Sequence, residues 1–122
     1  IKAALEHSVS QAPNENGAFL HVSGMKFTYD SSKPVGEKVV KMEVKGTDGT
    51  YTELDLTKNY FVATNTFTAK GGDGYTMFEN AYNEGRVSEP GNVDYEMFVE
   101  YLQQFETVEP TVEGRIVDVN KN

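Results

Sequence analysis

The sequence has 122 residues, a length typical of one domain with a core of its own. Its formal net charge is −8, which argues against a nucleic-acid polymer as partner because phosphate backbones are bound by clustered Lys and Arg. A single small nucleotide remains compatible with that charge. No apolar run approaches about 18 residues, so no membrane span is predicted. Cysteine is absent, which excludes disulfides and thiolate metal sites and is compatible with an exported bacterial protein.

The first half of the chain predicts a helix followed by strands. Residues 1–10 have a helical pattern with Ile1, Ala4 and Leu5 on one face, and the chain opens inside this pattern without a capping residue. We therefore expect a fragment of a longer protein. A loop over 11–17 precedes strands over 19–22 and 25–29, and a solvent-facing connection over 30–38 follows.

Residues 39–56 predict a β-hairpin with one face in water. Val40, Met42 and Val44 alternate with charged residues and are expected to point inward. A turn over 46–49 contains an Asp-Gly pair, and the alternation then resumes at Thr52, Leu54 and Leu56.

The stretch over 60–78 carries the strongest indication of a binding site. An apolar run at 60–64 predicts a strand covered on both faces, and the glycines of Gly71-Gly72-Asp73-Gly74 predict a sharp turn before a helix over 74–82. Small ligands tend to bind at such junctions in open α/β sheets. Two structural alternatives remain: Asp73 could be the N-cap of that helix, and Phe67 could belong to the core.

The C-terminal part predicts a second helix and a last strand. Asn92 is expected to cap that helix, and the strand is expected over 112–119. An apolar stripe on the helix predicts core packing for Met97, Phe98, Tyr101, Leu102 and Phe105. The whole chain, 1–122, is expected to form a single domain of the α/β or α+β class.

Catalytic patterns are missing from the sequence. The two histidines, His7 and His21, have no metal-ligand spacing to carboxylates or to each other, and we expect structural or surface roles for both. No G-x-S-x-G elbow is present, and Gly72-Asp73-Gly74 lacks both the later glycine of a dinucleotide fold and the Lys-Ser/Thr of a P-loop. What remains is binding.

Several motifs, in order along nearly the whole chain, resemble the C-terminal domain of the 5′-nucleotidase family, which includes UDP-sugar hydrolases and 2′,3′-cyclic-nucleotide phosphodiesterases. The motifs are Leu5-Glu6-His7-Ser8-Val9, Phe19-Leu20-His21-Val22-Ser23-Gly24, Tyr29-Asp30, Val62-Ala63-Thr64-Asn65-Thr66-Phe67, Gly71-Gly72-Asp73-Gly74-Tyr75 and Val112-Glu113-Gly114-Arg115-Ile116. The resemblance implies helices layered on mixed sheets.

The resemblance also implies a division of labour. In that family an N-terminal metallophosphoesterase domain with two divalent metal ions hydrolyses phosphate esters, and the C-terminal domain holds the nucleoside. Phe67 would stack on the base and Asp73 would bind the ribose hydroxyls, while Asn65 and the turn glycines Gly71, Gly72 and Gly74 would shape the pocket. The family is found outside the cytoplasm, so an extracellular, periplasmic or cell-wall location is expected.

The start of the chain departs from the family. A second stacking phenylalanine and the Asn and Arg contacts to base and phosphate belong to the part of the domain before the helix at residues 5–9. Arg86 and Arg115 do not match those positions. We therefore expect an N-terminally truncated domain with half a nucleoside site and no hydrolytic centre. The alternative is a non-catalytic surface or interaction module that retains the fold without binding nucleotides.

Overall fold

The computed structural model describes residues 1–121 and divides the chain into two compact units. Among these residues, the first unit consists of Ile1–Val62 and 113–121, and the second is Ala63–Val112. We describe each unit by itself. No helix among the described residues is both long enough and apolar enough to cross a bilayer.

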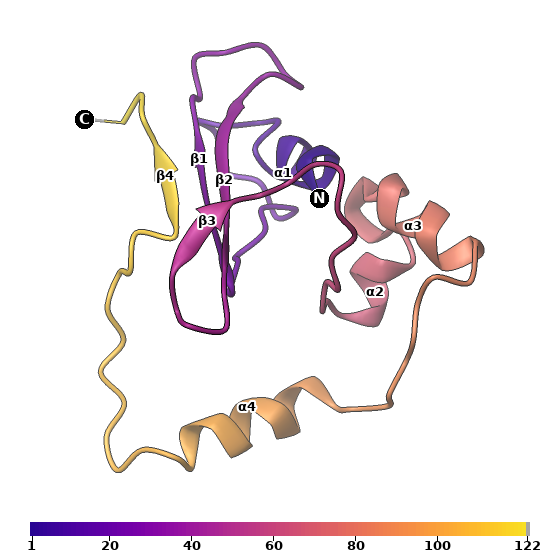
Figure 1. The fold of residues 1–122 in the computed structure, drawn as a ribbon, viewed down its shortest axis with the longest axis vertical. Helices are drawn as coiled ribbons and strands as arrows, with labels where there is room; N and C mark the ends of the chain where they lie inside the picture. The colour runs from indigo at the N-terminus through magenta and orange to yellow at the C-terminus, as the bar shows by residue number, and fades with distance from the viewer. Residues whose placement is uncertain (122) are drawn as a thin grey trace. The chain divides into compact units, whose positions relative to one another are not determined.

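The first unit is built on a four-stranded mixed sheet (Figure 1). Its strands are β1 (Met25–Tyr29), β2 (Val39–Lys45), β3 (Tyr51–Glu53) and β4 (Ile116–Asp118), in the order β3-β2-β1-β4. The pairs β1–β2 and β2–β3 are antiparallel, whereas β1 and β4 are parallel. The predicted α/β class and the predicted hairpin over β2 and β3 are thus confirmed.

A bulge in β2 corrects the predicted facing of one side chain. Thr28 pairs with Lys41, but Tyr29 pairs with Val39, so Val40 is the extra residue between two successive pairs. An extra residue reverses the in–out alternation on the bulged strand. Val39 is consequently buried, and Val40 is exposed instead of pointing inward as expected.

Helix α1 (Lys2–Ser8) packs on β2 and covers one face of the sheet (Figure 1). Its spacing places Leu5 and Val9 on the same side of the helix. The buried core of this unit consists of Leu5, Val9, Phe27, Tyr29 and Val39. The N-terminal helix and its buried face are as predicted from the sequence.

Polar side chains of α1 fasten the neighbouring loops to the helix. The Glu6 carboxylate accepts hydrogen bonds from the backbone N–H groups of Lys38 (2.9 Å) and Val39 (3.0 Å), and all three residues are buried. The Ser8 hydroxyl accepts one from the Leu20 N–H at 2.7 Å. Buried N–H groups need such partners, so these side chains are part of the scaffold.

Two predicted strands are wrong. Residues 19–22 and 60–64 form no strand, and Phe61 and Val62 are exposed. A strand requires an edge with which to pair, and in the part of the chain that the structure describes the sheet contains only β1 to β4. The apolar run at 60–64 therefore lies in an irregular segment.

The second unit contains the short helix α2 (Thr66–Ala69), the 3₁₀ turn η1 (Gly72–Gly74), α3 (Thr76–Asn83) and α4 (Asp94–Leu102). Helix α3 is close to its predicted range, whereas α2 was not predicted. The expectation that α4 packs in a core is wrong, because no residue of α4 is buried. Its N-cap is Val93, one residue after the predicted Asn92.

Candidate functional site

The candidate site begins at the N-terminus of α2, where Asn65 starts the helix. Asn65 has extended backbone dihedrals, and its Oδ1 atom accepts a hydrogen bond from the Thr68 N–H at 2.8 Å. This is the usual N-cap geometry, and it satisfies one of the free amide groups of the first turn. Asn65 therefore fixes the direction in which this four-residue helix leaves the preceding loop.

Helix α2 buries one side and presents Phe67 on the other. Thr68 and Ala69 are buried, whereas Phe67 is 61% exposed. The alternative in which Phe67 belongs to the core is therefore wrong. Large aromatic side chains contribute most to stability when they are buried, so an exposed phenylalanine on a capped helix is available for contact with another molecule.

The glycine-rich turn follows directly and holds Asp73 in an unusual backbone conformation. Gly71 and Gly74 have φ values of 90° and 84°, and Asp73 lies in the left-handed region with φ 55° and ψ 22°. Among the described residues, Asp73 is the only non-glycine with positive φ. Such a conformation costs about 1–3 kcal/mol, and residues that adopt it cluster at functional sites. The Asp73 side chain is exposed.

The turn is anchored by Tyr75, which is 1% exposed and stacks on Phe78 with ring centroids 5.7 Å apart. Tyr75 is also the N-cap residue of α3, so the alternative in which Asp73 is that N-cap is wrong. A buried aromatic at one end of the turn and a capped helix at the other hold the exposed Phe67 and Asp73 on an ordered frame.

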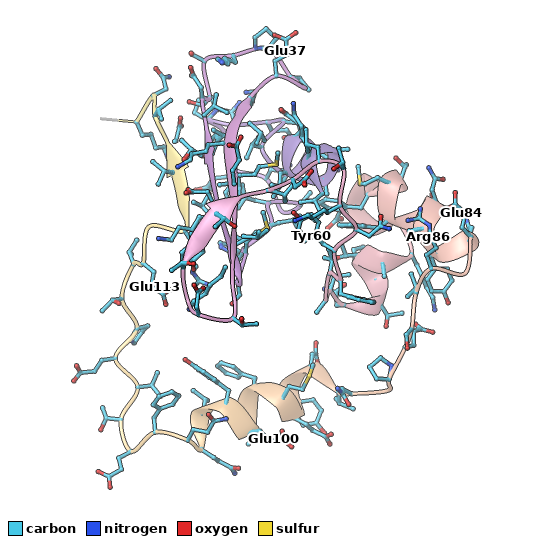
Figure 2. The ribbon with its side chains drawn as sticks, viewed as in Figure 1. Glu37, Tyr60, Glu84, Arg86, Glu100 and Glu113 are labelled. Carbon is cyan, nitrogen blue, oxygen red and sulfur yellow. The ribbon has the colours of Figure 1, made fainter. Side chains whose placement is uncertain are left out.

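The cations of this unit are engaged by neighbouring side chains. Lys70, which precedes the turn and was not singled out from the sequence, lies over the Tyr82 ring and 3.6 Å from Glu89. Hydrogen bonding to Tyr82, with the nearby charge of Glu89, raises the pKa of Lys70. Arg86 pairs with Glu84 at 2.7 Å (Figure 2).

Two residues outside this site that carry the family resemblance make contacts within the scaffold. Arg115 donates to the carbonyl oxygen of Val22 at 2.6 Å and so fastens the segment that leads into β4. His21 lies edge-on to Phe19, with ring centroids 5.6 Å apart. Among residues 1–121, no three His, Asp or Glu side chains gather in a group that could hold a metal ion.

The fold and the sequence together place the chain in the family of 5′-nucleotidase C-terminal domains. The family model described as "5′-nucleotidase, C-terminal domain" matches residues 1–80. The chain therefore belongs to this family of domains, which occur in 5′-nucleotidase-type phosphoesterases.

Individual relatives show the same relationship. The chain is 38% identical to the trifunctional nucleotide phosphoesterase protein YfkN of Bacillus subtilis, with 98% of this chain and 8% of that protein covered. It is 37% identical to a snake venom 5′-nucleotidase of Macrovipera lebetinus, covering 95% of this chain and 28% of that protein. A crystal structure of a 5′-nucleotidase precursor from Thermus thermophilus matches with a TM-score of 0.86 and 41% identity, covering 98% of this chain and 23% of that chain. The chain thus spans less than a third of each of these proteins.

Proposed function

We propose that this chain is the nucleoside-binding part of the substrate domain of a 5′-nucleotidase-type phosphoesterase that hydrolyses nucleotide phosphate esters. The observation that carries the proposal is the exposed Phe67 ring on a capped helix, followed closely by the exposed carboxylate of Asp73 in a strained turn. Both units of the chain would then be parts of one C-terminal domain over 1–122.

The chemistry of the two side chains suits a nucleoside. An aromatic face stacks on any base, and each such contact contributes about 1–3 kcal/mol. A carboxylate accepts hydrogen bonds from hydroxyl groups more strongly than a neutral acceptor does, which suits the ribose diol. The pair would therefore recognise base and sugar together, with Asn65 and the turn glycines Gly71, Gly72 and Gly74 setting the shape of the pocket.

Hydrolysis would take place elsewhere in the parent protein. The proposal assigns two divalent metal ions and the attack of water on the phosphate ester to an N-terminal metallophosphoesterase domain, and it assigns no reaction step to this chain. The parent would act outside the cytoplasm, in an extracellular, periplasmic or cell-wall location. The venom origin of one relative supports this placement.

The binding proposal is tested by titrating adenosine and AMP into the chain while following its amide NMR signals. We expect weak binding that shifts the signals of residues 65–75. Phe67→Ala should weaken it about 5- to 150-fold, the equivalent of the stacking contribution. Phe98→Ala is the matched control, because Phe98 is also 61% exposed but lies on α4.

Two results would contradict the proposal. If neither ligand shifts any signal of the folded chain, the non-catalytic interaction module becomes the better interpretation. If Phe67→Ala and Phe98→Ala weaken binding equally, the contact is not specific to the candidate site. A separate assay addresses catalysis: the purified chain with added divalent metal is expected to release no phosphate from AMP, and measurable release would refute the assignment of hydrolysis to another domain.

A further inference from the structure

The three glycines of the turn are required for different structural reasons. Gly71 and Gly74 have positive φ, which side-chain-bearing residues rarely adopt. Gly72 does not, so its backbone conformation is open to alanine. What excludes a side chain at Gly72 is its contact with Phe67.

A Cβ atom added to Gly72 would lie only 2.5 Å from both Cδ1 and Cζ of Phe67, with Cε1, the ring atom between them, nearest of all. Real Cβ atoms essentially never approach another heavy atom within 3.0 Å. Three consecutive ring carbons at nearly equal distance place this point over the face of the ring, because at its edge the two flanking carbons would be clearly farther away. One face of Phe67 therefore rests on Gly72.

We propose that Gly72 is a positioning residue that holds one face of Phe67 against the turn, so that the opposite face is the one offered to a nucleobase. The inference rests on the proposed nucleoside-binding function and extends it to the orientation of the stacking ring. The 61% exposure of Phe67 agrees with one covered face and one open face. Because stacking requires the two ring planes to be parallel and offset, a fixed ring orientation would also fix the plane of the bound base.

The contact between the Phe67 ring and Gly72 can be measured without any ligand. Protons over the face of an aromatic ring are shifted upfield, so at least one Gly72 Hα signal should lie upfield of the usual glycine range. Phe67→Leu, which removes the ring and keeps an apolar side chain, should return that signal to the usual range. An ordinary Gly72 Hα shift in the wild-type chain would overturn the proposal.

The role in binding is measured with Gly72→Ala, and Gly17→Ala is the matched control because no atom lies within 4 Å of the added Cβ and φ is not positive there. We expect Gly72→Ala to weaken adenosine binding at least about 5-fold, as loss of one stacking contact would. In a Phe67→Ala background the same change should weaken it less than 2-fold, because the ring that the Cβ displaces is already gone.

The outcomes separate the two proposals. Loss of binding with Phe67→Ala but unchanged binding with Gly72→Ala would overturn the positioning role and leave the nucleoside site standing. Unchanged binding with Phe67→Ala would refute the nucleoside site at Phe67. The Gly72 Hα shift would still show whether the Phe67 ring lies on Gly72. If Gly72→Ala unfolds the chain, the double variant Phe67→Ala/Gly72→Ala decides: restored folding supports the ring–glycine contact, and continued unfolding refutes it.

Discussion

Glu6 offers the sharpest test of what holds the first unit together. Glu6 lies on α1, and its buried carboxylate accepts hydrogen bonds from the backbone N–H groups of Lys38 and Val39, where β2 begins. Glu6→Ala would leave two buried donors without a partner, at about 1–3 kcal/mol each, so we expect the free energy of unfolding to fall by about 2–6 kcal/mol. Glu6→Gln keeps one acceptor oxygen but turns an NH₂ group toward the other donor. It should cost about 1–3 kcal/mol.

These losses are large compared with the total stability of a domain, about 5–15 kcal/mol. Urea unfolding followed by far-UV circular dichroism measures them, and the slope with denaturant should stay unchanged. Glu37→Gln is the matched control, since Glu37 lies exposed on the connection between β1 and β2 (Figure 2). It should alter the free energy by less than about 0.5 kcal/mol. Equal effects of Glu6→Gln and Glu37→Gln would refute the role of the buried carboxylate.

Three further predictions follow from exposure, charge and strain. Phe98→Ser should change the unfolding free energy of the chain by less than about 0.5 kcal/mol, because α4 has no buried residue; a loss above about 2 kcal/mol would show core packing. Hydrogen bonds from Thr50 hold the pKa of Asp48 below its usual range, so the ionised carboxylate stabilises the folded state. Asp48→Asn should therefore lower the urea midpoint at pH 7, and the difference in midpoint between wild type and variant should shrink as the pH falls from about 5 to about 2. A difference that stays constant with pH would contradict this prediction. Asp73→Gly should weaken adenosine binding, because it removes the carboxylate while glycine adopts the positive φ of this position readily; unchanged binding would contradict the proposed role of Asp73.

Local patterns predicted the elements whose neighbours are close in sequence. The alternation over 39–45 and 25–29 gave the bounds of β2 and β1, and the Asp-Gly turn gave the hairpin, in which Asp48 accepts hydrogen bonds from Thr50. The facing of Val40 could not be predicted, because the bulge depends on how β2 pairs with β1. The pairing of β4 with β1 is also hidden, since the paired residues Phe27 and Ile116 lie far apart in the chain.

Two apolar patterns in the sequence predicted burial that the structure does not show. The run at 60–64 and the stripe on α4 have the composition of buried elements, yet neither is buried in the described chain. An apolar pattern indicates that one face of a segment is suited to burial, but it does not identify the element that would cover that face. At the site, the sequence pointed to Phe67 and Asp73 through the resemblance alone; the positive φ of Asp73 and the resting of Phe67 on Gly72 are properties of the folded turn.

Some residues of the resemblance are buried in the scaffold, whereas those of the candidate site are exposed. Three of the buried residues stabilise the fold: Leu5 packs in the core, and the side chains of Glu6 and Ser8 accept backbone hydrogen bonds. The other group is exposed: the Phe67 side chain is 61% exposed, and Asp73 has a positive φ that glycine adopts without steric strain. Three of the four turn positions are already glycine, so a fourth would relieve the strain. Under the proposed function, a carboxylate at that position and an exposed aromatic ring nearby in the sequence are the two groups that a bound nucleoside would require.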